Sequence, residues 1–293
     1  MSFVPRTRPV RAALLALAPV ALGACAAATP GPSSAGQPIE LAPAQAPTYA
    51  DLVTFALAAD TVAVVQVDEQ IEFPAERAMD VPTGKARLYI EALTQALLAS
   101  PRAIGESMVF VTDAERDADG DVPDFEGRSV IVFADIVPTR PGEVQLVASN
   151  AMFPAGPVLE NRVRRVLEQL AAGDTPPAIT GVRDVISVPG NLAGESETQM
   201  FVETASGAPV SLSVVRRPGM TPEWGVSLGE IVDTAARPPE RESLAWFRLA
   251  CSLPRSLPSS AFLQNDRESI AQAQADYAFV LESLGPCERR FTS

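Results

Sequence analysis

The sequence contains no histidine, and Lys85 is the only lysine among its 293 residues. The lack of histidine excludes Ser-His-Asp and Cys-His catalysis, imidazole ligands to a metal and histidine-based pH switches. Aromatic residues make up only 6% of the chain, which disfavours a glycosidase that stacks sugars between paired carboxylates. The formal net charge is −13, and such an acidic chain repels nucleic-acid phosphates. We therefore expect no nucleic-acid partner.

The first 25 residues have the pattern of an export signal. Arg6, Arg8 and Arg11 form a positively charged start, and an uncharged apolar stretch follows at residues 12–22. This stretch is too short to cross a hydrocarbon core, which needs about 20 residues. Its length and position are instead typical of the central region of a secretory signal peptide.

Residues 22–25 read Leu-Gly-Ala-Cys, an aliphatic residue and two small residues before a cysteine. This pattern resembles the lipobox of bacterial lipoproteins. The resemblance implies cleavage between Ala24 and Cys25, lipidation of Cys25 with palmitate and attachment to a membrane through that lipid. Ala26 in place of aspartate implies the outer membrane, with the protein facing the periplasm. The alternative is ordinary cleavage at one of the Ala-x-Ala sites here and secretion to the periplasm without lipid.

The segment after Cys25 is rich in alanine, proline, glycine and serine, which is the composition of a flexible tether. No equally biased segment divides the rest of the chain. We expect a signal peptide over 1–24, the lipidated cysteine and tether over 25–47, a folded domain over 48–288 and a frayed tail over 289–293.

Cys251 and Cys287 remain once Cys25 carries the lipid, and exported proteins fold where disulfides persist. Residues 241–252 and 265–284 are predicted to be helices, and an antiparallel pair would bring the two cysteines together. We therefore predict a structural disulfide between them, worth about 3.8 kcal/mol for its loop length. A redox pair is the alternative, but the chain has no Cys-x-x-Cys motif to favour it.

The body alternates β-branched stretches with helical patterns and predicts an α+β fold. We expect a mainly antiparallel sheet, a central helix and a disulfide-linked helical pair at the C-terminal end. The alternative is two packed lobes divided near residue 175. The stretch 86–99 is ambiguous, although its second half, 92–99, favours a helix. Strands are expected at 61–73, 107–112, 128–137, 143–149, 181–188, 197–204, 210–217 and 223–230, and helices at 48–59 and 157–171.

An acidic loop is the one candidate metal site, with carboxylates at alternate positions around a glycine. Oxygen ligands at this spacing are what Ca²⁺ prefers, and the loop loosely resembles extracellular calcium repeats. It departs from the EF-hand, because Arg128 stands where the twelfth-position glutamate belongs. The alternative is a solvated acidic hairpin tip, and no other cofactor is expected. The candidate ligands are Asp117, Asp119, Asp121 and Asp124.

Residues 225–229 match the Gly-x-Ser-x-Gly pattern of a nucleophile elbow. That motif needs a histidine base and a strand-turn-helix context, whereas these residues lie in a predicted strand. We interpret the match as small residues at a place of close packing.

These observations favour a non-enzymatic binding or envelope-assembly module. We expect its partner to be an envelope protein. The alternative is a periplasmic hydrolase that uses carboxylates, with or without a metal. A deep pocket with convergent desolvated acids would favour the hydrolase. An apolar or edge-strand surface would favour the binding module. In its arginine-rich, alanine- and proline-rich composition the body resembles uncharacterised lipoproteins of Gram-negative bacteria, which implies no activity.

Overall fold

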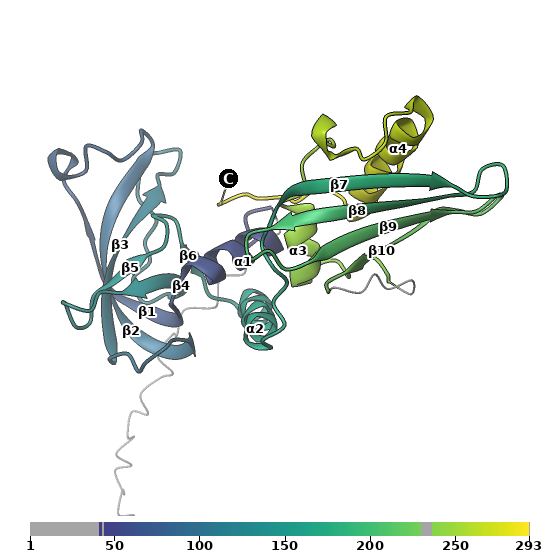
Figure 1. Cartoon of the computed structure of the whole chain (residues 1–293). Coiled ribbons are helices and arrows are strands. Elements are labelled where there is room, and N and C mark those ends of the chain that lie inside the picture. The colour runs from purple at the N-terminus through teal and green to yellow at the C-terminus, as the bar shows by residue number, and fades with distance from the viewer. Residues whose placement is uncertain (1–40, 43, 230–235, 293) are drawn as a thin grey trace, which may run out of the picture. The chain divides into compact units, whose positions relative to one another are not determined.

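The computed structural model describes residues 41–42, 44–229 and 236–292 of the chain. Within these residues it contains helices and two antiparallel sheets, which confirms the predicted α+β class (Figure 1). The single sheet that we expected is replaced by two, one on either side of residue 175 in the sequence. The described residues nevertheless belong to one compact unit with a contiguous apolar core. The cleavage and lipidation predicted at Ala24 and Cys25 lie outside the described residues.

The first sheet has the order β3-β2-β1-β4-β5, with β6 paired to β4. Strands β1 to β3 form a meander and β4 returns to lie beside β1, which is a Greek-key arrangement. A parallel bridge between Val109 and Glu143 then brings β5 back toward β3, so the sheet curls into a partly closed barrel. The strands are β1 Thr61–Glu72, β2 Lys85–Ala99, β3 Ser107–Glu115, β4 Ser129–Ile136, β5 Val144–Leu146 and β6 Met152–Pro154.

The prediction that residues 92–99 form a helix is wrong, because β2 continues to Ala99 as a strand. Pairing with β1 along this stretch, including Val67 with Ala92 and Val62 with Ala99, overrides the helical propensity of its Ala, Leu and Gln residues. The sequence does not show the alternation of apolar inner and polar outer residues in β2, because Leu93 and Leu97 on the outer face are apolar although each is 42% exposed.

The second sheet is a meander with the order β10-β9-β8-β7. Other segments of the chain contact both of its edges. On β7, Leu263 donates its N–H to the carbonyl of Val185, and the Gln264 side chain bonds both the N–H and the C=O of Ser187. On β10, Val226 donates to the carbonyl of Arg237. Its strands are β7 Ile179–Pro189, β8 Ser196–Thr204, β9 Val210–Arg216 and β10 Glu223–Ser227.

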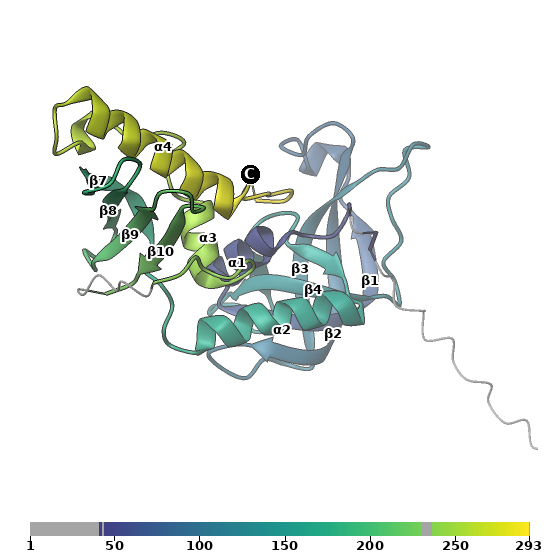
Figure 2. The same cartoon turned by 90° about the vertical axis from the view of Figure 1, so that its right-hand side faces the viewer.

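The helices follow the predicted positions closely. Thr48 and Asp51 form a capping box at the start of α1. Helix α4 is capped by Asp266, and it packs on the second sheet (Figure 2). The bounds are α1 Tyr49–Ala58, α2 Pro157–Ala171, α3 Leu244–Ala250 and α4 Arg267–Leu284, with 3₁₀ turns at Ala75–Arg77 and Ser259–Ala261.

The predicted disulfide joins Cys251, just after α3, to Cys287, just after α4. Within the tail that was expected to fray over 289–293, residues 290–292 make hydrogen bonds to the body. The backbone N–H groups of Arg290, Phe291 and Thr292 all donate to the Asp51 carboxylate.

The end of the expected tether also packs on the body. Pro47 is buried, and its carbonyl accepts a hydrogen bond from Arg162. The carbonyl of Ala46 accepts one from Arg290. The last two residues of the expected tether therefore contact the body through long-range hydrogen bonds that local composition does not show.

Candidate functional site

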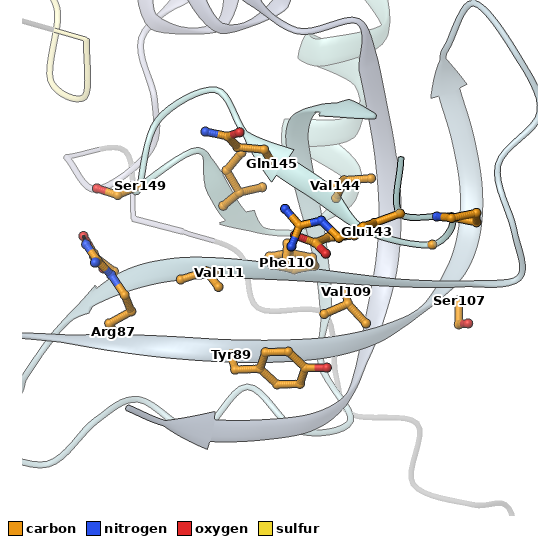
Figure 3. Close-up of a pocket in the computed structure, with 15 residues that line it drawn as sticks. Arg87, Tyr89, Ser107, Val109, Phe110, Val111, Glu143, Val144, Gln145 and Ser149 are labelled. Atoms are coloured by element: carbon orange, nitrogen blue, oxygen red, sulfur yellow. Dashed lines mark hydrogen bonds and ion pairs between the residues drawn. The ribbon is translucent and has the colours of Figure 1, made fainter. Parts of the chain in front are cut away.

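A hollow of about 800 Å³ lies on the outer face of β2 and β3, beside β5. Its floor includes two cross-strand pairs, Arg87 with Asp113 and Tyr89 with Val111. Its wall is the turn that joins β4 to β5 together with β5 itself. Figure 3 shows Glu143 and Gln145 across from Val111 and Tyr89.

The alternation of β2 and β3 places these side chains. Leu88 and Ile90 on β2 point into the core and are fully buried, whereas the odd-numbered neighbours Arg87 and Tyr89 face outward. On β3, Phe110 and Thr112 point inward and Val111 outward in the same way. Because the side-chain period of a strand is two, a one-residue slip would bury the charges and expose the core.

The hollow lies where the pairing between β3 and β5 is interrupted. At one end the N–H of Val109 donates to Gly142, at 2.8 Å, and at the other the N–H of Asp113 donates to Ser149, at 2.7 Å. Alternate residues of a strand direct their backbone groups to the same side, so the N–H and C=O of Val111 also point toward β5. Among the described residues, these two groups of Val111 have no hydrogen-bond partner.

The facing chain is longer than β3 between these two bonds. It runs from Gly142 to Ser149 while β3 runs only from Val109 to Asp113, so the two chains cannot keep a regular ladder between these bonds. Gly142, with a positive φ of 86°, lies at the start of this irregular stretch. The hollow therefore lies beside a part of β3 whose pairing with the facing chain is incomplete.

The charged side chains of the hollow form ion pairs with one another or with a neighbouring acid. Arg87 binds Asp113 through two hydrogen bonds of 2.8 and 3.2 Å and also binds Asp80. The carboxylates of Asp113 and Asp80 raise the pKa of the Arg87 guanidinium, so it stays charged. Arg140 pairs with Glu143 at 2.9 Å. Both arginines are thus compensated, and the hollow holds no uncompensated cation that would attract an anion.

The phenol of Tyr89 donates a 3.0 Å hydrogen bond to Glu91, and this bond raises the pKa of Tyr89. Its ring lies beside Val111, which is 39% exposed, so the floor also offers apolar contact. Among the residues that line the hollow, no nucleophile is held against a base. The arrangement is suited to binding rather than to bond making.

The comparisons with known proteins give no family for this chain. No protein-family model and no curated protein matches it. Among the helices that the structure describes, none has the length and apolarity required to cross a bilayer. The candidate site is therefore argued from geometry alone.

A second hollow, of about 580 Å³, lies between the β7–β8 turn and the start of α4. Beneath it the fully buried carboxylate of Asp276 accepts hydrogen bonds from Arg216 at 2.5 Å, from Gln272 at 3.1 Å and from Thr198. The hydroxyl of Ser196 is buried without a partner among the described residues. We interpret this cluster as the polar attachment of α4 to the second sheet.

The fully buried carboxylates of the described part of the chain lie apart from one another. Asp51 and Asp276 are the fully buried acids there, and each is surrounded by hydrogen-bond donors. Asp51 joins the start of α1 to the C-terminal tail by hydrogen bonds, whereas Asp276 joins α4 to the second sheet. No cavity brings these two acids together, and the two acids that line the main hollow, Asp113 and Glu143, are each paired with an arginine.

The acidic loop is bonded mainly to itself. The Asp117 carboxylate accepts the N–H groups of Asp119 and Asp121, each at 2.9 Å, and Asp124 accepts that of Glu126. Over residues 41–42, 44–229 and 236–292, no group of three or more acidic or cysteine side chains is placed to hold a metal ion. The Ca²⁺ prediction gains no support, and the alternative of a hairpin tip accounts for these bonds.

The Gly-x-Ser-x-Gly match lies where the sequence placed it, in a strand. Gly225 and Ser227 belong to β10, without the sharp turn that a nucleophile elbow requires. A Cβ atom at Gly225 would collide with the backbone of Ala236, so glycine is needed there for close packing. The small residues of this motif therefore have a structural role.

Sequence reasoning missed every residue of the main hollow. The signal that could have found them is the alternation of charged and apolar residues in β2 and β3, with Arg87 opposite Asp113. That pairing becomes visible only once the two strands are placed in register.

Proposed function

We propose that the chain is a lipid-anchored protein that faces the periplasm and binds an envelope protein through the hollow on β2, β3 and β5. It acts without catalysis. The lipobox at 22–25 supplies the anchor on Cys25 and the following segment the tether. Because residues 1–24 carry three arginines and no acid, the exported chain is more acidic still, and it is repelled by anionic lipid surfaces rather than drawn onto them.

The observation that carries the proposal is the unpaired strand edge at Val111. Exposed edges in natural sheets are usually covered or blunted, because they pair readily with other chains. In this protein other segments contact both edges of the second sheet. The unpaired edge at Val111 lies in the main hollow and beside exposed apolar surface.

The anchor is tested with the variant Cys25→Ala. We expect the wild type to incorporate radiolabelled palmitate and to fractionate with membranes, and the variant to lose the label and to be released. A wild type without label, together with a variant that stays in the membrane fraction, would contradict the lipid anchor.

The binding site is tested by site-specific photo-crosslinking in intact envelopes. A benzoylphenylalanine in place of Gln145, at the hollow, is expected to give a discrete crosslinked product. The matched control is the same residue in place of Leu263, which is 58% exposed but lies on the covered edge of the second sheet. Equal crosslinking from the two positions, or none from Gln145, would overturn the hollow as the binding site.

A further inference from the structure

We propose that the second hollow, between the β7–β8 turn and the start of α4, binds a small aliphatic amine through an ammonium group. This site is separate from the main hollow on β2, β3 and β5 and does not depend on the function proposed for it. Its basis is a buried hydroxyl without a partner, together with an excess of hydrogen-bond acceptors and of acid around that hydroxyl.

The buried hydroxyl belongs to Ser196, the first residue of β8, which lines this hollow and is only 8% exposed. Alternate side chains of a strand point to the same face, so Ser196 points to the same side as Thr198, whose hydroxyl bonds Asp276 of α4. The Ser196 hydroxyl is therefore directed toward α4 and the hollow. It has no hydrogen-bond partner among the described residues, and a buried hydroxyl without a partner costs free energy that a ligand can recover.

Gln272 of α4 adds a second acceptor to the same hollow. Its Nε2 donates to the Asp276 carboxylate at 3.1 Å, and because a carboxylate only accepts, this bond fixes which way the amide lies. The Gln272 Oε1 therefore faces away from Asp276, and no group of the described chain donates to it. The sheet and the helix thus each present an open acceptor, and an ammonium group, with three donors and no acceptor, matches them.

The lining of this hollow is acidic. It includes Glu195, Asp266 and Glu268, whereas no lysine or arginine of the described residues lines it. Arg267 lies on the same turn but outside the lining, and Arg216, beneath the hollow, is already paired with a buried acid. An ammonium group therefore gains from the field of the hollow, whereas a carboxylate or a phosphate loses.

The start of a helix usually favours an anion, but α4 supplies its own negative charges there. The Asp266 carboxylate accepts the N–H of Ser269 at 2.8 Å and caps the helix. Glu268 adds a second carboxylate in the first turn. The positive end of α4 is thus compensated, and the hollow keeps its preference for a cation. Its volume of about 580 Å³ lies in the range of sites that enclose small molecules.

The test compares three five-carbon probes on the full chain in detergent at physiological salt, where diffuse attraction to the acidic surface is screened beyond about 8 Å. The probes are cadaverine, which carries an ammonium group at each end, pentanediol and glutarate. By calorimetry we expect cadaverine to bind, pentanediol to bind at least about tenfold more weakly and glutarate not to bind. Cadaverine should also raise the melting temperature, because it binds the folded state alone.

The variant Ser196→Ala removes the unpartnered hydroxyl. Because no described group bonds that hydroxyl, we expect the melting temperature without cadaverine to stay unchanged, whereas cadaverine should bind about tenfold more weakly or worse. The matched control is Ser211→Ala, which changes another buried serine of the same sheet that does not line this hollow. Its binding is expected to stay within about threefold of the wild type.

The charge of the hollow is tested with Glu268→Gln, which removes one negative charge and keeps the shape of the side chain. We expect cadaverine to bind about threefold to tenfold more weakly. The matched control is Glu197→Gln, an exposed acid that is adjacent to Ser196 in the sequence but points to the opposite face of β8. This control should leave binding within about twofold of the wild type.

A wild type that does not bind cadaverine, or that binds pentanediol or glutarate as tightly, would overturn the inference. So would equal binding of cadaverine by the wild type and Ser196→Ala, because Ser196 would then hold no more than a water molecule. Circular dichroism checks that each variant is folded, and Glu268→Gln, at an exposed position, decides the question if Ser196→Ala is not. The photo-crosslink at Gln145 reports on the main hollow, so the two proposals can fail separately.

Discussion

The two sheets of this protein differ in the hydrogen bonding at their strand edges. Other segments bond to both edges of the second sheet, the Leu263–Gln264 segment along β7 and Arg237 at Val226 of β10. In the first sheet β5 meets β3, but the hydrogen bonding between them is incomplete around Val111. The comparison therefore contrasts edges that other segments contact with a stretch of strand whose backbone groups have no partner among the described residues.

The largest expected effect concerns the buried carboxylate that holds α4 on the closed sheet. Arg216→Met leaves Asp276 buried without its cation, and we expect the free energy of unfolding to fall by about 3 kcal/mol. Denaturant unfolding measures this. The control Arg217→Met removes an adjacent arginine that is half exposed and pairs with exposed Glu223, so a change below about 1 kcal/mol is expected. Equal effects would show that the cluster does not stabilise this sheet.

The next effect concerns acid and the tail of the chain. Burial alone would raise the pKa of Asp51, but the N–H groups of Thr48, Phe291 and Arg290 and the hydroxyl of Thr292 outweigh it and lower that pKa. A carboxyl with a lowered pKa in the folded state stabilises the fold at neutral pH, and this contribution is lost as the pH falls below about 4.

The variant Asp51→Asn should therefore be less stable than the wild type at pH 7, and the difference should shrink between pH 5 and pH 3. Thermal unfolding at a series of pH values measures both curves. Parallel curves would mean that the carboxylate charge does not hold the tail.

A smaller effect on the free energy of unfolding is expected when the hydrogen bonds along the edge of β7 are removed. Gln264→Ala removes two hydrogen bonds to Ser187, whose side chain and backbone are buried, and we expect a loss of about 2 kcal/mol. The uncovered edge should also raise the tendency to aggregate. Gln199→Ala is the control, because that glutamine bonds only exposed Glu197. A stable, monodisperse Gln264→Ala protein would remove the contrast between the sheets.

The smallest effect on stability is expected at the open edge. Val111→Pro should change the free energy of unfolding by less than about 1 kcal/mol, because no described group bonds the lost N–H. A large loss of stability would mean that the N–H of Val111 has a partner in solution, and the difference between the two sheets would then disappear.

The amount that could be predicted depended on how far apart the interacting residues lie in the sequence. Helices α1 and α2 lie close to the predicted ranges, and the start of α1 is fixed by a capping box of Thr48 and Asp51, which spans only three residues. The same Asp51 carboxylate binds Arg290, 239 residues away, and nothing near either residue indicates that bond. The tail was expected to fray for this reason.

The hollow was beyond prediction for a related reason. Its residues become a site only when β2, β3 and β5 are in register, and residues 92–99 had to be recognised as strand before that register could be drawn. Leu93 and Leu97 on the outer face obscured the alternation. Propensity within a short window cannot anticipate a pairing that a neighbouring strand imposes.

The sequence alone determined the exclusions and the local elements. The absence of histidine removed the Gly-x-Ser-x-Gly match from consideration, and the count of cysteines led to the Cys251–Cys287 bridge that the structure contains. The tertiary structure alone decided which strand edges are covered, because an edge is open or closed according to chain segments remote in sequence. That choice left Val111 unpaired in the hollow, and the proposed binding site depends on it.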